Sequence, residues 1–214
     1  MNMEYTWMAL WLNNIFSGMD YALLNLFHKL AEVAGNFFTP FFSLISLVAE
    51  KGIGLIILSV VLLFFKKTRK TGTVMLVAIL IGAVITNVLL KNIVARPRPY
   101  VDVQSAFHQW WKIVGSNVLS EYSFPSGHTT ATMAVATAFF LCGNKKYSWL
   151  GFIFVVLMGM SRNYLMVHYP SDVLAGVIVG LIAGVLSYII VNVVINLSRT
   201  KNRLTVAKEI EKEI

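Results

Sequence analysis

The sequence has little charge and almost no cysteine. Charged side chains make up 13% of the 214 residues, only ten residues are acidic, and Cys142 is the single cysteine. One cysteine excludes an intrachain disulfide, and its apolar neighbours favour a small buried side chain. Because the few Asp, Glu and His residues do not cluster at the spacing of metal ligands, we predict no metal site and no cofactor.

Hydrophobic residues, in contrast, make up 57% of the chain, and the mean hydropathy is +0.70. This composition excludes an ordinary soluble domain and indicates a polytopic membrane protein. The net charge of +8 could suggest nucleic-acid binding. However, the cations gather at the ends of apolar segments and form no basic face with interleaved aromatic residues, so we predict no nucleic-acid partner.

Charged residues divide the chain into six apolar segments. A membrane-spanning helix needs about 20 mainly apolar residues, and Lys or Arg at the ends of the shorter segments can reach the interface. The pattern therefore predicts an all-α, polytopic membrane helical bundle with six transmembrane helices. Residues 7–34 mix aromatic and charged side chains, which is typical of an N-terminal interfacial helix. The six segments are residues 33–49, 52–65, 71–90, 122–144, 147–161 and 173–198.

We expect one membrane-embedded domain over residues 1–214. Residues 1–4 lack the positive stretch and the cleavage site of a signal peptide, so we expect the whole chain to be mature. Residues 199–214 contain Lys and Glu at helical spacing and are predicted to form a solvated cytoplasmic tail. The expected partners are membrane lipids, and the sequence makes no prediction of the oligomeric state.

The first of three polar clusters lies at the end of the third apolar segment, where Lys91 is followed by Arg98-Pro99. A guanidinium can bind two phosphate oxygens at once, and an ammonium adds a mobile point charge. Lys91 taken alone also fits an ordinary interfacial anchor. Arg96-Pro97 is a second Arg-Pro pair, so the chemistry alone leaves open which arginine binds an anion.

The second cluster is Pro125-Ser126-Gly127-His128, at the start of the fourth segment. A helix beginning here would point free N–H groups outward, where the helix dipole favours an anion. Gly127 would let a phosphate approach the backbone, and His128 could transfer a proton near neutral pH. The alternative is a helix-capping turn with an incidental histidine.

The third cluster contains Ser161-Arg162, His168 and Asp172. Pro170 predicts a new helix, with Asp172 in its first turn. Such a carboxylate could fix the tautomer of an imidazole and leave its other nitrogen free as a nucleophile. Arg162 within an apolar segment needs a polar partner or a cavity, so it is a functional candidate. The alternative is an Arg–Asp pair that only ties two helices together.

These clusters resemble the three signature motifs of the type-2 phosphatidic acid phosphatase superfamily, in order and in placement. The matching motifs, all within residues 91–172, are Lys91-x6-Arg98-Pro99, Pro125-Ser126-Gly127-His128 and Ser161-Arg162-x5-His168-x3-Asp172. The resemblance favours Arg98 over Arg96, so we expect Arg96→Ala to be milder than Arg98→Ala. It also implies a metal-independent lipid phosphatase.

By this resemblance, His168 would be the nucleophile that forms a phosphohistidine, Asp172 would orient it, and His128 would protonate the leaving group. The implied phosphate-binding residues are Lys91, Arg98, Ser126, Gly127 and Arg162. The substrate would be a lipid phosphate or diphosphate, with undecaprenyl diphosphate slightly favoured. Phosphatidylglycerophosphate and phosphatidic acid are the alternatives. A more remote alternative is a non-catalytic lipid transporter.

Lys and Arg near the segment ends predict the orientation. Eleven of them lie in the loops after the second and fourth segments and in the tail, and six lie on the opposite side. Positively charged loops tend to remain in the cytoplasm. We therefore predict a multi-pass protein of the plasma membrane with a cytoplasmic C-terminus and all three clusters on the extracytoplasmic side.

Overall fold

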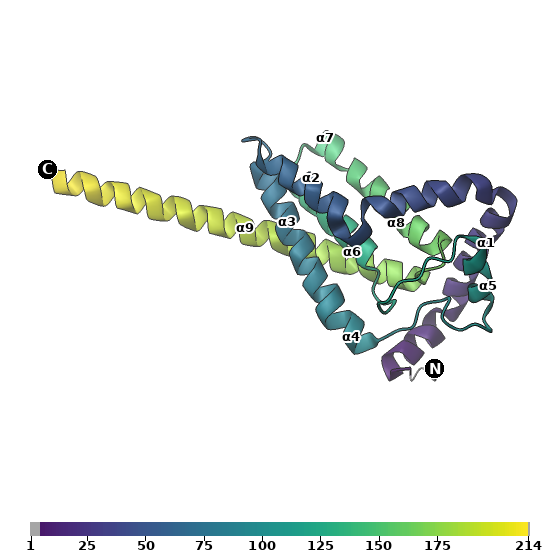
Figure 1. The fold of residues 1–214 in the computed structure, drawn as a ribbon. Coiled ribbons are helices and arrows are strands. Elements are labelled where there is room, and N and C mark those ends of the chain that lie inside the picture. Colours follow the sequence, from purple (N-terminus) through teal and green to yellow (C-terminus); the bar gives the residue numbers. More distant parts are fainter. Residues whose placement is uncertain (1–4, 214) are drawn as a thin grey trace.

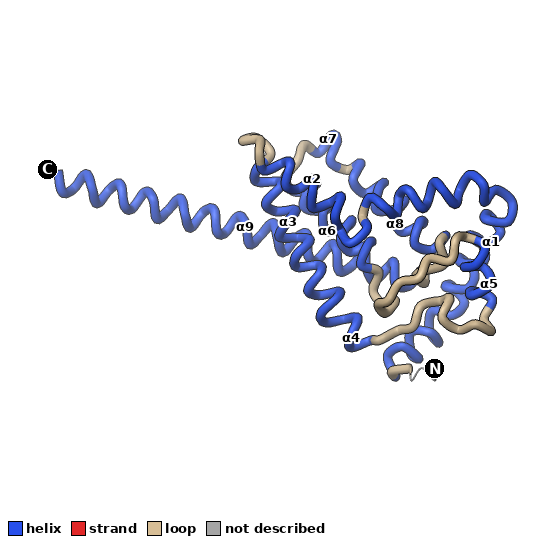
Figure 2. Tube along the Cα trace, viewed as in Figure 1, coloured by secondary structure: helices blue, strands red, loops and turns tan. Residues whose placement is uncertain are grey.

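The computed structural model describes residues 5–213, so the prediction for residues 1–4 lies outside the described residues. This described part consists of helices and loops without strands, which confirms the all-α prediction (Figures 1 and 2). The elements are α1 (Trp7–Val48), a 3-10 turn (Glu50–Gly52), α2 (Ile53–Leu63), α3 (Arg69–Ala83), a π-helical segment (Val84–Leu90), α4 (Lys91–Val94), α5 (Ala106–Ile113), α6 (Gly127–Cys142), α7 (Lys145–Ser148), α8 (Leu150–Tyr164) and α9 (Pro170–Glu213).

Three helical stretches are long and apolar enough to cross a membrane, which agrees with a membrane protein. They are Trp7–Val48, Arg69–Val94 and Pro170–Thr205, and Ile53–Leu63 is a shorter apolar helix. Helices α6 and α8 lie within or overlap the fourth and fifth predicted spans but contain only 16 and 15 residues. The count of six transmembrane helices therefore remains a prediction.

Helix α1 is broken at Ala34, whose φ of −141° is not helical. This break falls where the predicted interfacial segment meets the first predicted span. The two halves run in different directions, the first past α5 and the second towards α2 (Figure 1). The interfacial position of the first half and the start of the first span remain predictions.

Helix α6 lies at the centre of the bundle and packs against α3, α8 and α9. The contact with α9 is close because three glycines recur every four residues along that helix. A Cβ added to Gly176, Gly180 or Gly184 would lie 2.8, 2.5 or 2.5 Å from the nearest atom of residues 126–137. Small residues at this spacing let two helix backbones approach each other.

The ends of several helices meet in one region of the molecule. The end of α8 and the starts of α6 and α9 lie together there (Figures 1 and 2). The loop 95–105 leads from α4 to α5, and the loop 114–126 leads from α5 to α6. Ser126 at the start of α6 donates its N–H to the carbonyl oxygen of Asp172 on α9 at 3.0 Å. The loop between α2 and α3, together with α7, lies away from this region (Figure 1).

Candidate active site

The three sequence clusters come together where these helix ends meet, around two adjoining cavities. The first cavity has a volume of about 320 Å³ and is lined by Lys91, Arg98, Gly127, His128 and His168, among others. The second has a volume of about 600 Å³ and is lined by His128 and Arg162 together with apolar side chains of α1 and the loops. His128 borders both cavities.

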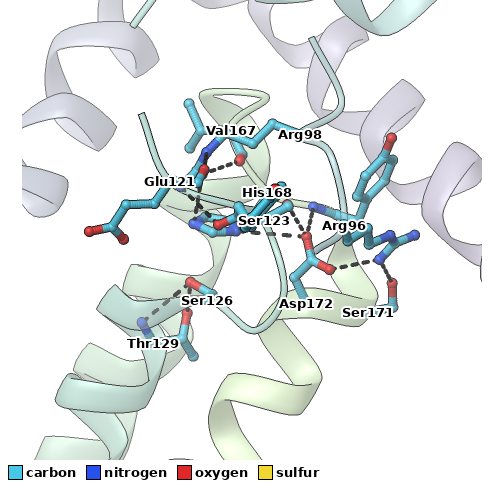
Figure 3. A network of polar contacts seen from close by, with 12 residues as sticks. Arg96, Arg98, Glu121, Ser123, Ser126, Thr129, Val167, His168, Ser171 and Asp172 are labelled. Carbon is cyan, nitrogen blue, oxygen red and sulfur yellow. Dashed lines mark hydrogen bonds and ion pairs between the residues drawn. The ribbon is translucent and has the colours of Figure 1, made fainter. Parts of the chain in front are cut away.

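The guanidinium of Arg98 is held in place by backbone carbonyls (Figure 3). Its Nε donates to Glu121 O at 2.7 Å, its Nη1 to Val167 O at 2.7 Å and its Nη2 to Tyr122 O at 3.3 Å. Nη1 also lies 3.1 Å from Nε2 of His168. Arg98 is therefore fixed at the cavity wall without a carboxylate partner in the described part of the chain.

The partners of His168 determine its tautomer. Arginine only donates hydrogen bonds, so Nε2 of His168 must present its lone pair to Arg98. The proton then lies on Nδ1, which is 3.5 Å from Ser123 Oγ and 3.7 Å from Asp172 Oδ2. This is the arrangement of a nucleophilic Nε2 with a carboxylate behind the opposite nitrogen.

His168 lies in the short loop between α8 and α9 and is only 2% exposed. Burial lowers its pKa well below the ordinary value of 6.5, and the nearby cations of Arg98, Arg162 and Lys91 lower it further. The neutral imidazole is therefore strongly favoured before substrate binds.

Asp172 lies in the first turn of α9, as the sequence predicted. Its Oδ2 accepts the backbone N–H of Tyr169 at 2.9 Å, so the carboxylate caps the start of its own helix. Oδ2 also accepts a hydrogen bond from Ser123 Oγ, and Oδ1 accepts one from Arg96 Nη1 at 2.7 Å. Asp172 is therefore fully buried and fully hydrogen-bonded (Figure 3).

Lys91 follows the π-helical segment that connects α3 to α4, and its side chain is 7% exposed. Its ammonium forms an ion pair with Glu121 from the loop before α6. This hydrogen bond holds the pKa of the Glu121 carboxyl below its ordinary value. Glu121 therefore remains ionised and pairs with Lys91, which was predicted from the sequence to bind phosphate.

Ser126 and Gly127 differ in whether they line the first cavity. Ser126 is the N-cap residue of α6, and its buried Oγ accepts hydrogen bonds from Thr129 (Figure 3). It lines neither cavity, so its side chain serves the helix start. Gly127 lines the first cavity, where a Cβ added to it would lie 3.9 Å from Lys91 Nζ.

Arg162 enters the site from the last turn of α8 and is 3% exposed. Its Nη1 donates to Ser46 Oγ of α1, and its Nε has no hydrogen-bond partner among the described residues. Its position on the second cavity brings it beside His128. The predicted alternative, an Arg162–Asp172 pair, does not occur, because Asp172 pairs with Arg96 instead.

Four residues of the region were not predicted from the sequence as parts of the site: Asp20, Arg96, Glu121 and Ser123. Arg96 and Asp20 are buried together behind Asp172, while Ser123 and Glu121 belong to the loop before α6. A lone carboxylate in an apolar helix, as at Asp20, requires a buried partner and was the one available signal. Nothing in the loop sequence identifies Ser123 or Glu121.

Comparisons with known proteins agree with this geometry. The model of the PAP2 superfamily matches residues 72–195, which is more than half of the chain and includes all three clusters. The chain belongs to the PAP2 superfamily. This confirms the family that the motifs predicted.

The chain also resembles named relatives and a solved structure. The chain is 33% identical to a lipid A 4'-phosphatase of Porphyromonas gingivalis over 74% of this chain and 70% of that protein. It is 36% identical to an undecaprenyl-diphosphatase of Sulfolobus acidocaldarius over 54% of this chain, and that match spans about half of the relative, 52%. The structure resembles Aquifex aeolicus LpxE with a TM-score of 0.63 and 26% identity over 77% of this chain and 93% of the other.

Proposed function

We propose that the protein is a membrane lipid phosphatase that removes a terminal phosphate from a lipid phosphate or diphosphate through a phosphohistidine. The observation that carries the proposal is the geometry of His168. His168 lines the first cavity, and its Nε2 lone pair lies beside Arg98. Asp172 lies behind the Nδ1–H on the opposite side of the ring. The family and the relatives named as lipid phosphatases support the same reaction class.

In the first step, Nε2 of His168 attacks the phosphorus and the bond to the leaving oxygen breaks. His128, which borders both cavities, gives that oxygen its proton. Asp172 keeps the proton on Nδ1 and stabilises the positive ring that forms. In the second step, His128 takes a proton from a water, whose oxygen attacks the phosphorus; the P–Nε2 bond breaks, phosphate leaves, and His168 returns to the neutral imidazole while His128 is protonated again.

Charge stabilisation would come from Lys91, Arg98 and Arg162, together with the backbone N–H groups at the start of α6. Phosphoryl transfer needs little beyond positioning and neutralisation of charge on the phosphate oxygens. Arg98 already presents a fixed guanidinium, and the unpartnered Nε of Arg162 is a buried donor that lacks an acceptor. We propose on this basis that the reaction requires no metal ion.

The membrane arrangement proposed with this function has six transmembrane helices. The active site faces the extracytoplasmic side and the C-terminal end of α9 lies in the cytoplasm, as the distribution of Lys and Arg predicts. Undecaprenyl diphosphate is the slightly favoured substrate, supported by the relatives of that name. Phosphatidylglycerophosphate and phosphatidic acid are the alternatives, the former supported by a Bacillus subtilis relative named phosphatidylglycerophosphatase B.

Phosphate release in detergent, with EDTA present, tests both the reaction and its independence of metal. We expect hydrolysis of undecaprenyl diphosphate or phosphatidylglycerophosphate that survives chelation, and the faster lipid identifies the substrate class. No release from these two lipids would direct the assay to phosphatidic acid, and no release from any of the three contradicts the proposal. Activity that EDTA abolishes and added metal restores contradicts the metal-free mechanism.

His168→Ala separates the phosphatase from the more remote alternative, a non-catalytic lipid transporter. The variant should lose hydrolysis while it still binds the lipid, because Arg98 and Arg162 do not depend on the imidazole for their position. Hydrolysis close to the wild-type rate would show that His168 is not the nucleophile.

A further inference from the structure

A buried network behind the catalytic groups connects the N-terminal helix α1 to Asp172. Its members are Asp20 of α1, Arg96 of the loop after α4, and Ser171 and Asp172 at the start of α9. All four are at most 4% exposed. None of them lines either cavity.

Arg96 is the centre of this network. Its Nη1 donates to Asp172 Oδ1 and to Ser171 Oγ, both at 2.7 Å, and its Nη2 donates to Asp20 Oδ2 at 2.9 Å. Its Nε donates to Asn13 Oδ1 at 2.8 Å. All three nitrogens of the guanidinium thus have acceptors, which fixes its plane and with it the position of Asp172 Oδ1. Figure 3 shows Arg96 between Ser171 and Asp172.

Asp20 also binds the start of α9 directly. Its Oδ1 accepts the backbone N–H of Ser171 at 2.9 Å, and its Oδ2 accepts Ser171 Oγ at 2.7 Å. This N–H is one of the free donors at the start of α9, so a carboxylate from α1 caps the helix that carries Asp172. Asp20 therefore orients both Arg96 and the backbone of the catalytic turn.

The charge balance explains why two carboxylates are needed. Asp172 faces Arg96 on one side and His168 on the other, with Arg98 beyond the imidazole. If Asp20 did not share the charge of Arg96, Asp172 would be the only anion paired with that cation. It would then be drawn towards Arg96, and its electrostatic interaction with the His168 ring, whose Nδ1 lies 3.7 Å from Oδ2, would weaken.

We propose that Asp20 and Arg96 are positioning residues for catalysis, which hold Asp172 at the distance and charge that His168 requires. This inference rests on the proposed phosphatase function. It assigns the first half of α1 a role in the active site. It also reverses the expectation that Arg96→Ala would be a mild change, since Arg96 is bonded to the catalytic carboxylate.

The test uses Arg96→Lys and Asp20→Asn, because both substitutions keep the size and polarity of the side chain. Arg96→Ala is avoided, since it would leave two buried carboxylates without a cation and prevent folding. Asp102→Asn is the matched control, because Asp102 is exposed in the loop after Arg98 and contacts none of the network. Thermal unfolding in detergent establishes that each variant is folded.

We expect each network variant to lower kcat for lipid phosphate about tenfold or more, with KM within about twofold of the wild type. Arg96→Lys weakens the hydrogen bonding to Asp172 Oδ1, and Asp20→Asn lets Arg96 draw Asp172 away from His168. Asp102→Asn should retain wild-type kcat. The double variant should be no slower than the slower single variant, because both act through one network. Unchanged kcat, a rise in KM alone, or additive losses would overturn the proposal.

A second readout requires no turnover. In 15N-histidine NMR without substrate, Asp20→Asn and Arg96→Lys should move the Nδ1–H signal of His168, while Asp102→Asn leaves it in place. An unmoved signal in both network variants would overturn the proposal. Should the wild type release no phosphate, the proposed function fails, and this readout still decides whether the network positions Asp172 against His168.

Discussion

The contact between α6 and α9 yields a quantitative prediction, because Gly180→Ala places a methyl group where there is no room. The added Cβ would lie 2.5 Å from Thr130 O and 2.6 Å from Met133 Cβ. Carbon atoms pack at about 3.5–4.0 Å, so the two helices must separate by about 1 Å. Both obstructing atoms belong to or adjoin the backbone of α6 and cannot rotate away.

Overpacking of this kind costs about 1–3 kcal/mol, and the better helix propensity of alanine returns about 0.5–1 kcal/mol. We therefore expect a net loss of up to about 2.5 kcal/mol, or a Tm lowered by up to about 10 °C for a chain of this size. Activity should fall further than stability, because the start of α6 carries His128 and is bonded to Asp172. A displacement of about 1 Å can lower a rate about 100-fold.

Thermal unfolding followed by tryptophan fluorescence, together with phosphate release at 25 °C, measures both effects. Gly18→Ala is the control, since Gly18 is an exposed residue of α1 and a Cβ added there meets nothing within 4 Å. This control should be as stable as the wild type or slightly more stable. If Gly180→Ala matched Gly18→Ala in Tm and in activity, the close contact of α6 and α9 would not position the site.

Three further predictions concern residues around His168. Ser123→Ala removes a hydrogen bond to the Asp172 carboxylate, worth about 1.5–3 kcal/mol, and should lower kcat about tenfold or more in the phosphate-release assay; an unchanged kcat would contradict its role. Burial and the neighbouring cations lower the pKa of His168, so its neutral form should persist as the pH falls through 6.5, and 15N NMR should show no titration where free imidazole titrates. Glu121→Gln releases Lys91 from an ion pair that phosphate must displace, so KM should fall about two- to fivefold with kcat unchanged, whereas a higher KM would show that Glu121 helps to bind substrate.

The sequence singled out Lys91, Arg162 and Asp172 because each is marked by local chemistry. Lys91 ends an apolar segment, Arg162 interrupts one, and Pro170 places Asp172 in a first helical turn. Each of these signals acts within a few residues, and the structure confirms the helix start at Pro170. Lys91 and Arg162 line the cavities, whereas Asp172 lies behind His168. The break in α1 at Ala34 was not predicted from the sequence.

The sequence could not predict which distant residues would meet behind the site. Arg96 is 76 residues from both Asp20 and Asp172, and no periodicity connects them. The role of Ser126 was also assigned differently, because a serine before Gly-His fits a phosphate ligand and a helix cap equally well. The structure shows that its hydroxyl caps α6 by accepting hydrogen bonds from Thr129, three residues further along the chain.

The distribution of charge supports the proposal that this site binds an anionic ligand. Arg96 pairs with the two buried carboxylates, Asp20 and Asp172, so neither is free to neutralise the arginines at the cavities. In the part of the chain that the structure describes, Arg98 donates only to carbonyl oxygens and His168, and Arg162 only to Ser46. Carbonyl and hydroxyl dipoles orient a guanidinium but form no ion pair with it, and a buried cation is favoured by further negative charge. Among the described residues, the carboxylates that line the cavities are Glu50 and Glu121, and Glu121 is already paired with Lys91. In the proposed reaction, a phosphate group supplies further negative charge, and the charge that develops on its oxygens in the transition state would increase that stabilisation. Because Arg96 pairs directly with Asp172, this carboxylate forms no ion pair with Arg98 or Arg162, which leaves both arginines able to bind phosphate in the proposed mechanism.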